Sequence, residues 1–160
     1  SFGLDDESAK RIARIIMATG LKNEFQEQNW ETPLERDAGA ILGSADLLGQ
    51  MSDRAYLEKL LFLYYEFREA GIPGYDTEFD ILRKTIGFYE MTVTILGGRL
   101  LGAKDWARVH FLSRYGVDRN LYDEAISCQM DYLRKILADD STNFRKKLKR
   151  LDLESLAALS

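Results

Sequence analysis

Apolar positions recur every three to four residues along most of this chain, which is the spacing of amphipathic α-helices. The first such segment follows Asp5 and Asp6 and ends at Gly20, and its expected inward positions are Ala9, Ile12, Ile15, Ile16 and Thr19. The polar stretch 21–31 then predicts a long loop whose two aromatic residues, Phe25 and Trp30, pack onto the domain.

The next two helices have recognisable start signals. Thr32-Pro33-Leu34-Glu35 matches a capping box with proline at the first helical position, so a helix is expected to run from here to about Leu48. Its expected inward positions are Leu34, Ala38, Ile41, Leu42 and Ala45. Ser52 or Asp53 can cap a third helix, which ends before the Gly-Ile-Pro-Gly turn at 71–74 and buries Leu57, Leu60, Leu61, Tyr64 and Phe67.

Four more helices complete the pattern. We expect them over 77–96, over 105–115 with Gly116 as the stop, over 120–137, and in a short segment after Ser141. The helix over 120–137 is expected to bury Leu121, Ala125, Cys128, Tyr132 and Ile136. Residues 153–160 are expected to form a frayed or partner-dependent tail. The chain is therefore predicted to be all-α, an irregular bundle of six to seven helices in a single domain over 1–160.

The composition limits which cellular location and which classes of binding partner are expected. Hydrophobic residues make up 46% and charged residues 30%, the balance of an ordinary globular protein. The net charge of -4 argues against nucleic acid as a partner, and the basic run over 145–150 is interpreted as a solvated helix end. A lone cysteine, Cys128, indicates a reducing, cytoplasmic setting and a small buried side chain. No apolar stretch approaches the ~20 residues that cross a bilayer, so no membrane partner is expected.

The usual catalytic motifs are missing. The chain has no glycine-rich phosphate loop, no Cys-x-x-Cys pair and no Gly-x-Ser-x-Gly elbow. Its single histidine, His110, lies between Val109 and Phe111 with no acid beside it, which is typical of a packed or surface histidine rather than a catalytic base. Acyl-transfer chemistry therefore has little support.

The most informative acid is Asp46, which lies between Ala45 and Leu47 near the end of the predicted second helix. An acid among apolar residues needs a hydrogen bond, an ion pair or a metal. Gln50 and Arg54 follow at i+4 and i+8 and would share its face if the helix continued, although the glycine at 49 could bend that path. The residues alone leave two interpretations open: a structural acid, paired with Arg54 or capping a nearby helix, or a ligand.

The run Ile15-Ile16-Met17-Ala18-Thr19, followed after a loop by Gly43-Ser44-Ala45-Asp46-Leu47-Leu48-Gly49, resembles the second half of an HD-domain metal-dependent phosphohydrolase. The segments beginning at Tyr56 and at His110 are similar to a bacterial branch of that family. The resemblance implies that Asp46 matches the final aspartate ligand of a divalent metal. It places Gln50 and Arg54 where substrate or phosphate contacts lie, whereas Lys59 is interpreted as solvated surface.

The departure from the HD pattern is large. That family also uses an early histidine and an adjacent His-Asp pair, and here the single histidine follows Asp46 instead of preceding it. One carboxylate holds a divalent ion weakly, so we expect this chain alone to bind no metal and to be inactive. The start on Ser1 suggests a fragment that lacks upstream helices. The first two helices would then expose apolar faces, and the chain is expected to oligomerise, exchange elements or retain an N-terminal piece.

Three functions remain at this stage. The first is the C-terminal part of a phosphohydrolase that acts on a small phosphate ester with a divalent metal bound in the full-length protein. The second is a non-catalytic helical interaction module that uses exposed aromatics, for which Phe25, Trp30 and Trp106 are candidates. The third is a ligand sensor whose aromatic third and fourth helices enclose an apolar pocket lined by Tyr64, Tyr65, Phe67, Phe79, Phe88 and Tyr89.

Overall fold

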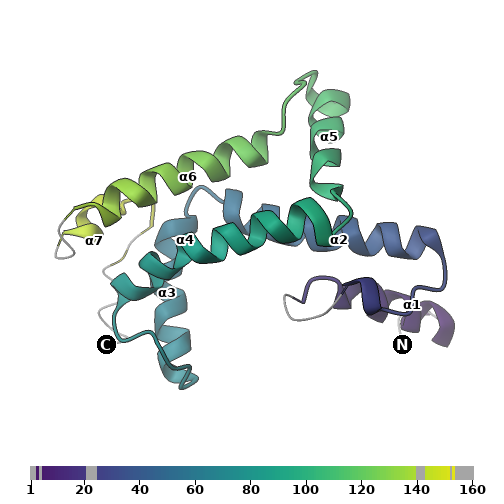
Figure 1. The fold of residues 1–160 in the computed structure, drawn as a ribbon, viewed down its shortest axis with the longest axis horizontal. Helices are drawn as coiled ribbons and strands as arrows, with labels where there is room; N and C mark the ends of the chain where they lie inside the picture. The colour runs from purple at the N-terminus through teal and green to yellow at the C-terminus, as the bar shows by residue number, and fades with distance from the viewer. Residues whose placement is uncertain (1–2, 4, 21–24, 140–142, 152, 154–160) are drawn as a thin grey trace. The chain divides into compact units, whose positions relative to one another are not determined.

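A computed structural model describes residues 3, 5–20, 25–139, 143–151 and 153 of the chain. Within them it contains seven α-helices and no strand, which confirms the all-α prediction (Figure 1). The α-helices are α1 (Asp6–Met17), α2 (Pro33–Ser52), α3 (Tyr56–Glu69), α4 (Glu78–Thr94), α5 (Trp106–Tyr115), α6 (Leu121–Leu137) and α7 (Phe144–Lys147). Two 3₁₀ turns, η1 (Phe25–Glu27) and η3 (Ala103–Asp105), and a π-helical turn, η2 (Ile95–Arg99), connect them.

Local capping explains why most helix starts fall where the sequence predicts them. The carboxylate of Asp5 accepts the backbone N–H of Ser8 at 2.7 Å at the start of α1. At the start of α4, Thr77 and Asp80 form a reciprocal pair: the Asp80 carboxylate accepts the Thr77 N–H at 2.9 Å, and the Asp80 N–H donates to the Thr77 hydroxyl at 3.3 Å. Gly116, in the left-handed conformation with φ 68°, ends α5 as expected.

The chain divides into two compact units. The first unit consists of residues 1–50 and 91–122, and the second of 51–90 and 123–160. The prediction of a single domain over 1–160 is not tested by this division and stays a prediction. In the described part of the chain, no helix is both long enough and apolar enough to cross a membrane.

The core of the second unit follows the predicted face of α3. Leu57, Leu60, Leu61 and Tyr64 are buried there, and the ring of Phe67 is half-buried against Tyr75, with 5.0 Å between ring centroids. In α6, however, the predicted inward face is wrong except for Ile136, because the buried positions are Ile126, Gln129, Met130, Leu133 and Ile136. Helix α6 has two overlapping apolar faces, and the face with the longer aliphatic side chains, Ile126, Met130, Leu133 and Ile136, is the buried one. Cys128, expected to be buried, is exposed.

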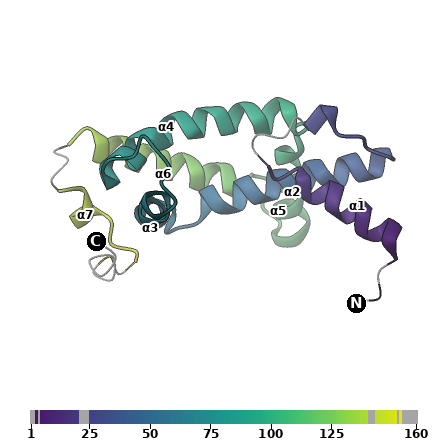
Figure 2. The same ribbon diagram turned by 90° about the horizontal axis from the view of Figure 1, so that it is seen from below.

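The predicted inward faces of α1 and α2 are also wrong. Ile12 and Ile16 of α1 are exposed, as are Leu34 and Ile41 of α2. Helix α2 buries a different line of residues instead: Glu35, Gly39, Ala40, Gly43, Ser44, Leu47, Leu48 and Met51. Figures 1 and 2 show α1 beside the first part of α2, and the contact between them is made by polar and small residues rather than by the apolar stripes.

The interpretation of the basic run over 145–150 as a solvated helix end holds only in part: all of its basic residues except Lys147 are exposed, but Arg145 and Arg150 also contact buried groups of the second unit. The Arg145 guanidinium pairs with the Glu78 carboxylate, with Nε–H donated to Oε2 at 2.7 Å. The Arg150 N–H donates to the buried Glu58 carboxylate at 3.0 Å, and its guanidinium donates to the Gln129 side-chain oxygen at 3.1 Å. Of the predicted tail, all but residue 153 lies outside the described residues.

Candidate functional site

Asp46 lies on α2 and is half-buried, between the exposed Ala45 and the buried Leu47. Its Oδ1 accepts a hydrogen bond from the side-chain amide of Gln50 at 2.8 Å. Among the ion pairs of the described residues, none involves Asp46. The carboxylate is therefore held by one neutral donor, and it is less buried than an acid among apolar residues was expected to be.

The other two predicted site residues behave differently from each other. Gln50 contacts Asp46 because α2 continues through Gly49 without interruption, so the expected i+4 contact forms. Arg54 does not extend this face, because α2 ends at Ser52 and the chain turns at Asp53. The side chain of Arg54 is exposed, and its backbone carbonyl accepts a hydrogen bond from the Arg150 guanidinium. Arg54 was expected on the face of Asp46 only if the helix continued, and that condition is not met, whereas it is met for Gln50.

The two segments that carry the HD resemblance meet in the first unit. A Cβ built on Gly43 would lie 2.7 Å from the backbone oxygen of Ala18, so the end of α1 packs directly on α2 three residues before Asp46. The methyl groups of Leu100 lie 3.2 and 3.3 Å from the same point. The missing side chain of Gly43 therefore allows the backbone at the end of α1 to approach α2 closely.

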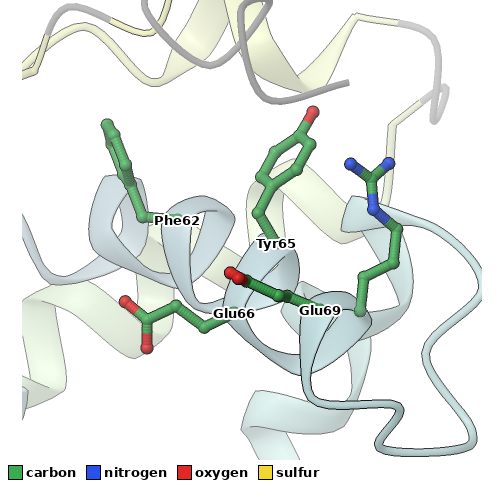
Figure 3. Close-up of a pocket in the computed structure, with 5 residues that line it drawn as sticks. Phe62, Tyr65, Glu66 and Glu69 are labelled. Atoms are coloured by element: carbon green, nitrogen blue, oxygen red, sulfur yellow. The ribbon is translucent and has the colours of Figure 1, made fainter.

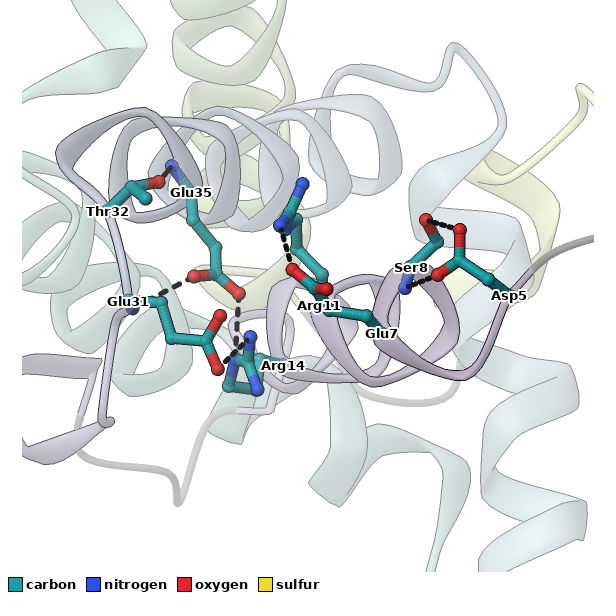
Figure 4. Close-up of polar contacts among 8 residues, drawn as sticks. All are labelled: Asp5, Glu7, Ser8, Arg11, Arg14, Glu31, Thr32 and Glu35. Carbon is teal, nitrogen blue, oxygen red and sulfur yellow. Dashed lines mark hydrogen bonds and ion pairs between the residues drawn. The ribbon is translucent and has the colours of Figure 1, made fainter.

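Glu35, which the sequence marked only as part of a capping box, is a buried acid at the other end of this helix contact. The side chain of Glu35 is 0% exposed, and its carboxylate accepts the Arg14 Nε–H at 2.7 Å and the Glu31 backbone N–H at 2.9 Å (Figure 4). The Glu35 N–H donates to the Thr32 hydroxyl at 3.1 Å, the first half of the predicted capping box. Burial opposes ionisation of Glu35, but the hydrogen bonds from Arg14 and the Glu31 N–H outweigh it and lower the pKa of this carboxyl.

The aromatic residues of the loop fasten it to the same helix. Phe25 is buried, and its backbone oxygen accepts the indole N–H of Trp30 at 3.0 Å. A Cβ on Gly39 would lie 2.5 Å from the outer edge of the Trp30 ring, so only glycine leaves room for this ring to contact α2 so closely. The prediction that Phe25 and Trp30 pack down onto the domain is confirmed, although residues 21–24 of the predicted loop lie outside the described residues.

The single histidine does not join Asp46 in a ligand cluster. His110 is exposed on α5, and its ring packs edge-on against Phe111 at 5.2 Å and Tyr115 at 6.0 Å between centroids, as expected of a surface histidine. Over the described residues, no group of three or more His, Cys, Asp or Glu side chains could hold a metal ion. The residues that the structure describes therefore do not fit a metal by themselves.

Two pockets of the second unit bear on the sensor hypothesis. One, of about 390 Å³, is lined by Phe62, Tyr65, Glu66, Arg68 and Glu69 of α3 (Figure 3). The Arg68 guanidinium lies 4.8 Å from the centroid of the Tyr65 ring. The other, of about 730 Å³, is lined by residues 76–80 with Arg83, Phe144 and Arg145. Charged side chains make up more than half of each lining, so neither is the enclosed apolar pocket that the hypothesis requires.

The comparisons with known proteins give one family. A family model described as Npun_R2479-like matches residues 7–96, which contain all of α1 except Asp6, together with Asp46, Gln50 and Arg54. No curated protein matches the chain, and no solved structure matches it.

Proposed function

This chain belongs to the Npun_R2479-like family, and we propose that it is the C-terminal part of a metal-dependent phosphohydrolase of the HD type, with Asp46 as the final ligand of a divalent metal. The observation that carries the proposal is the state of the Asp46 carboxylate. It is half-exposed, bound by one neutral amide, and three residues beyond the close contact between Gly43 and Ala18.

The proposal requires ligands from outside these 160 residues. One carboxylate with one amide neighbour lacks the converging donors that a divalent ion needs, so the chain alone should bind no metal and hydrolyse nothing. When bound, the metal supplies a Lewis acid and an activated water for attack on a phosphoester. Gln50, through its hydrogen bond, fixes the orientation of the Asp46 carboxylate and is proposed to act through it rather than on substrate.

The test uses the longest reading frame that contains these residues. The purified polypeptide, supplied with Mn²⁺, is assayed on bis-p-nitrophenyl phosphate and on nucleotides, and its metal content is measured. Asp46→Asn should lower both activity and metal content by at least about 100-fold, since even residues that only support a ligand are worth about 10–100-fold. Asp37→Asn, which changes an exposed acid on the same helix, serves as the control and should leave both unchanged.

Three results would defeat the proposal. The first is a reading frame that adds no histidine and no His-Asp pair to this chain. The second is a longer polypeptide that binds metal and hydrolyses none of the phosphoesters. The third is an Asp46→Asn variant with the activity and metal content of the Asp37→Asn control.

A second candidate function, a non-catalytic interaction module, is favoured by the distribution of exposed apolar side chains. Thirteen of the fifteen large hydrophobic residues exposed among the described residues belong to the first unit, and only Ile72 and Tyr132 belong to the second. Where such side chains adjoin, they would mark an interaction surface. Trp106 is exposed and suits this function, whereas Phe25 is buried and Trp30 half-buried, so two of the three predicted contact aromatics do not. Absence of the histidine ligands from the reading frame would favour the module.

A further inference from the structure

Residues 147–150, which we call the docked segment, lie against helices of the second unit in the manner of a bound peptide. The chain leaves α7 at Leu148, where the backbone is extended with φ -92° and ψ 101°. The Leu148 side chain is buried, and the preceding backbone oxygen, that of Lys147, accepts the Tyr132 hydroxyl of α6 at 2.7 Å. An extended backbone with a buried apolar side chain and a main-chain hydrogen bond is a common form of peptide recognition.

Arg150 is the second anchor of the docked segment. Its backbone N–H donates to the Glu58 carboxylate of α3 at 3.0 Å. Its guanidinium donates to the side-chain oxygen of Gln129 at 3.1 Å and to the backbone oxygen of Arg54. Gln129 is buried, and its amide donates in turn to the backbone oxygen of Asp53, so the oxygen that accepts the guanidinium is held in place.

The surface under Arg150 has a hydrogen-bonding capacity that the docked segment does not use. Glu58 is 2% exposed, and its Oε1 accepts the Arg150 backbone N–H. Its other oxygen, Oε2, is buried and accepts no hydrogen bond from the part of the chain that the structure describes. An unmet acceptor in the interior is costly, so a ligand with one more donor at this level would bind better than the docked segment does.

We propose that these groups of α3 and α6 recognise an extended basic peptide of a partner protein, with a leucine two residues before an arginine, and that the docked segment is an internal competitor for it. Charge supports this class of ligand, because residues 145–150 contain five bases and no acid in a chain of net charge -4. The proposal concerns the second unit only. It goes beyond the proposed metal site at Asp46, which lies in the first unit, and does not depend on it.

Displacement of the docked segment requires few residues to move. The Arg145 guanidinium pairs with the buried Glu78 carboxylate and holds the start of the segment, so only the residues from 147 onward have to leave. An attached competitor acts at an effective concentration on the order of mM. The unchanged chain should therefore bind an added peptide weakly, and a substitution that weakens the docked segment should strengthen the binding.

The test measures the fluorescence anisotropy of a labelled, amidated peptide with the sequence of residues 147–151, Lys-Leu-Lys-Arg-Leu, titrated with the full chain. Arg150→Ala in the chain keeps the backbone N–H that Glu58 accepts but removes the hydrogen bonds of the guanidinium. This variant should bind the peptide at least about 10-fold more tightly than the unchanged chain. Lys149→Ala, which removes the neighbouring exposed base, is the control and should bind like the unchanged chain.

Three altered peptides test the recognition pattern on the Arg150→Ala chain. Peptides that carry Leu148→Ser or Arg150→Ala should each bind at least about 10-fold more weakly, because each loses one of the two anchors. A peptide that carries Lys149→Ala should keep its affinity. Equal losses for the lysine and arginine replacements would mean general charge attraction and would overturn the proposal.

Other outcomes are equally decisive. Equal affinity of the unchanged chain and the Arg150→Ala chain would show that the docked segment does not compete. A concentration-dependent dimer of the Arg150→Ala chain that excludes the peptide would make a second copy the occupant, and the proposal would fail. If circular dichroism shows that Arg150→Ala unfolds the chain, the peptide at about 1 mM should restore the helical signal by mass action. Without that restoration the segment is only a structural tail, and the proposal is overturned.

Discussion

Two glycines of α2 provide a direct test of the close contact between α1 and α2. A Cβ on Gly43 would lie 2.7 Å from the Ala18 backbone oxygen and 3.2 Å from a methyl of Leu100, whereas a Cβ on Gly49 would meet no atom within 4 Å. Both glycines are interior positions of one helix, so replacement by alanine gains about 1 kcal/mol of helix propensity at each. The difference between the two variants therefore isolates the steric overlap at Gly43.

The expected size of that difference follows from the contact itself. Overpacking a tight site costs about 1–3 kcal/mol, and the nearest atom here is a backbone oxygen, which cannot rotate away as a side chain can. We therefore expect Gly43→Ala to be less stable than Gly49→Ala by about 2–3 kcal/mol. Relative to the unchanged chain, Gly49→Ala should be more stable by up to about 1 kcal/mol and Gly43→Ala less stable by about 1–2 kcal/mol.

Urea unfolding followed by far-ultraviolet circular dichroism measures both effects, provided that the slopes agree among the three proteins. A Gly43→Ala protein with the unfolding midpoint of Gly49→Ala, or a higher one, would refute the reasoning. It would mean that the end of α1 does not press on α2 next to Asp46, and the structural support for the proposed metal site would be lost with it.

Three further predictions concern the charged and apolar cores. Glu35→Gln should lower the melting temperature at about pH 7. Because the pKa of Glu35 is lowered in the folded chain, the difference in melting temperature between the two proteins should shrink as the pH falls below about 4.3. A difference that stays constant down to pH 3 would contradict this prediction. Leu61→Ala, at a fully buried position, should cost about 2–5 kcal/mol in urea unfolding. Arg145→Met should lower the free energy of unfolding by about 1–3 kcal/mol, less than the loss of a fully buried ion pair, because Arg145 of the Arg145–Glu78 pair is partly exposed. The control is Arg134→Met, which removes the exposed Arg134–Asp131 pair and should lower it by less than about 0.5 kcal/mol.

The positions of the helices were predictable because their signals are local. Caps at Asp5, Thr32 and Thr77 and the stop at Gly116 act within four residues of the chain, and each does so in the structure. The contact between Asp46 and Gln50 is equally local, since it needs only the i+4 spacing and a helix that continues.

The buried faces were harder to predict because they depend on distant partners. Helices α1, α2 and α6 carry apolar residues on more than one side, so periodicity alone does not decide which side is buried. In α2 the decision depends on Glu35, whose burial is possible only because Arg14, 21 residues earlier, supplies the matching charge. The capping box at Thr32 singled out Glu35 but gave no sign of that partner. The position of Arg54 depended on where the helix stops, and the end of α2 at Ser52 places it off the face of Asp46.

The hydrogen bonds of the C-terminal segment 143–151 limit how far the chain can be shortened. Glu58 and Glu78 are both buried, and their hydrogen-bond partners, the Arg150 backbone and the Arg145 side chain, lie within six residues of each other near the end. Removal of everything after Asp139 would delete no part of the family-matched stretch 7–96, yet it would leave two carboxyl groups without these donors in the interior. A minimal fragment designed from the matched residues alone is thus expected to misfold for an electrostatic reason, and expression trials should keep the chain through residue 151.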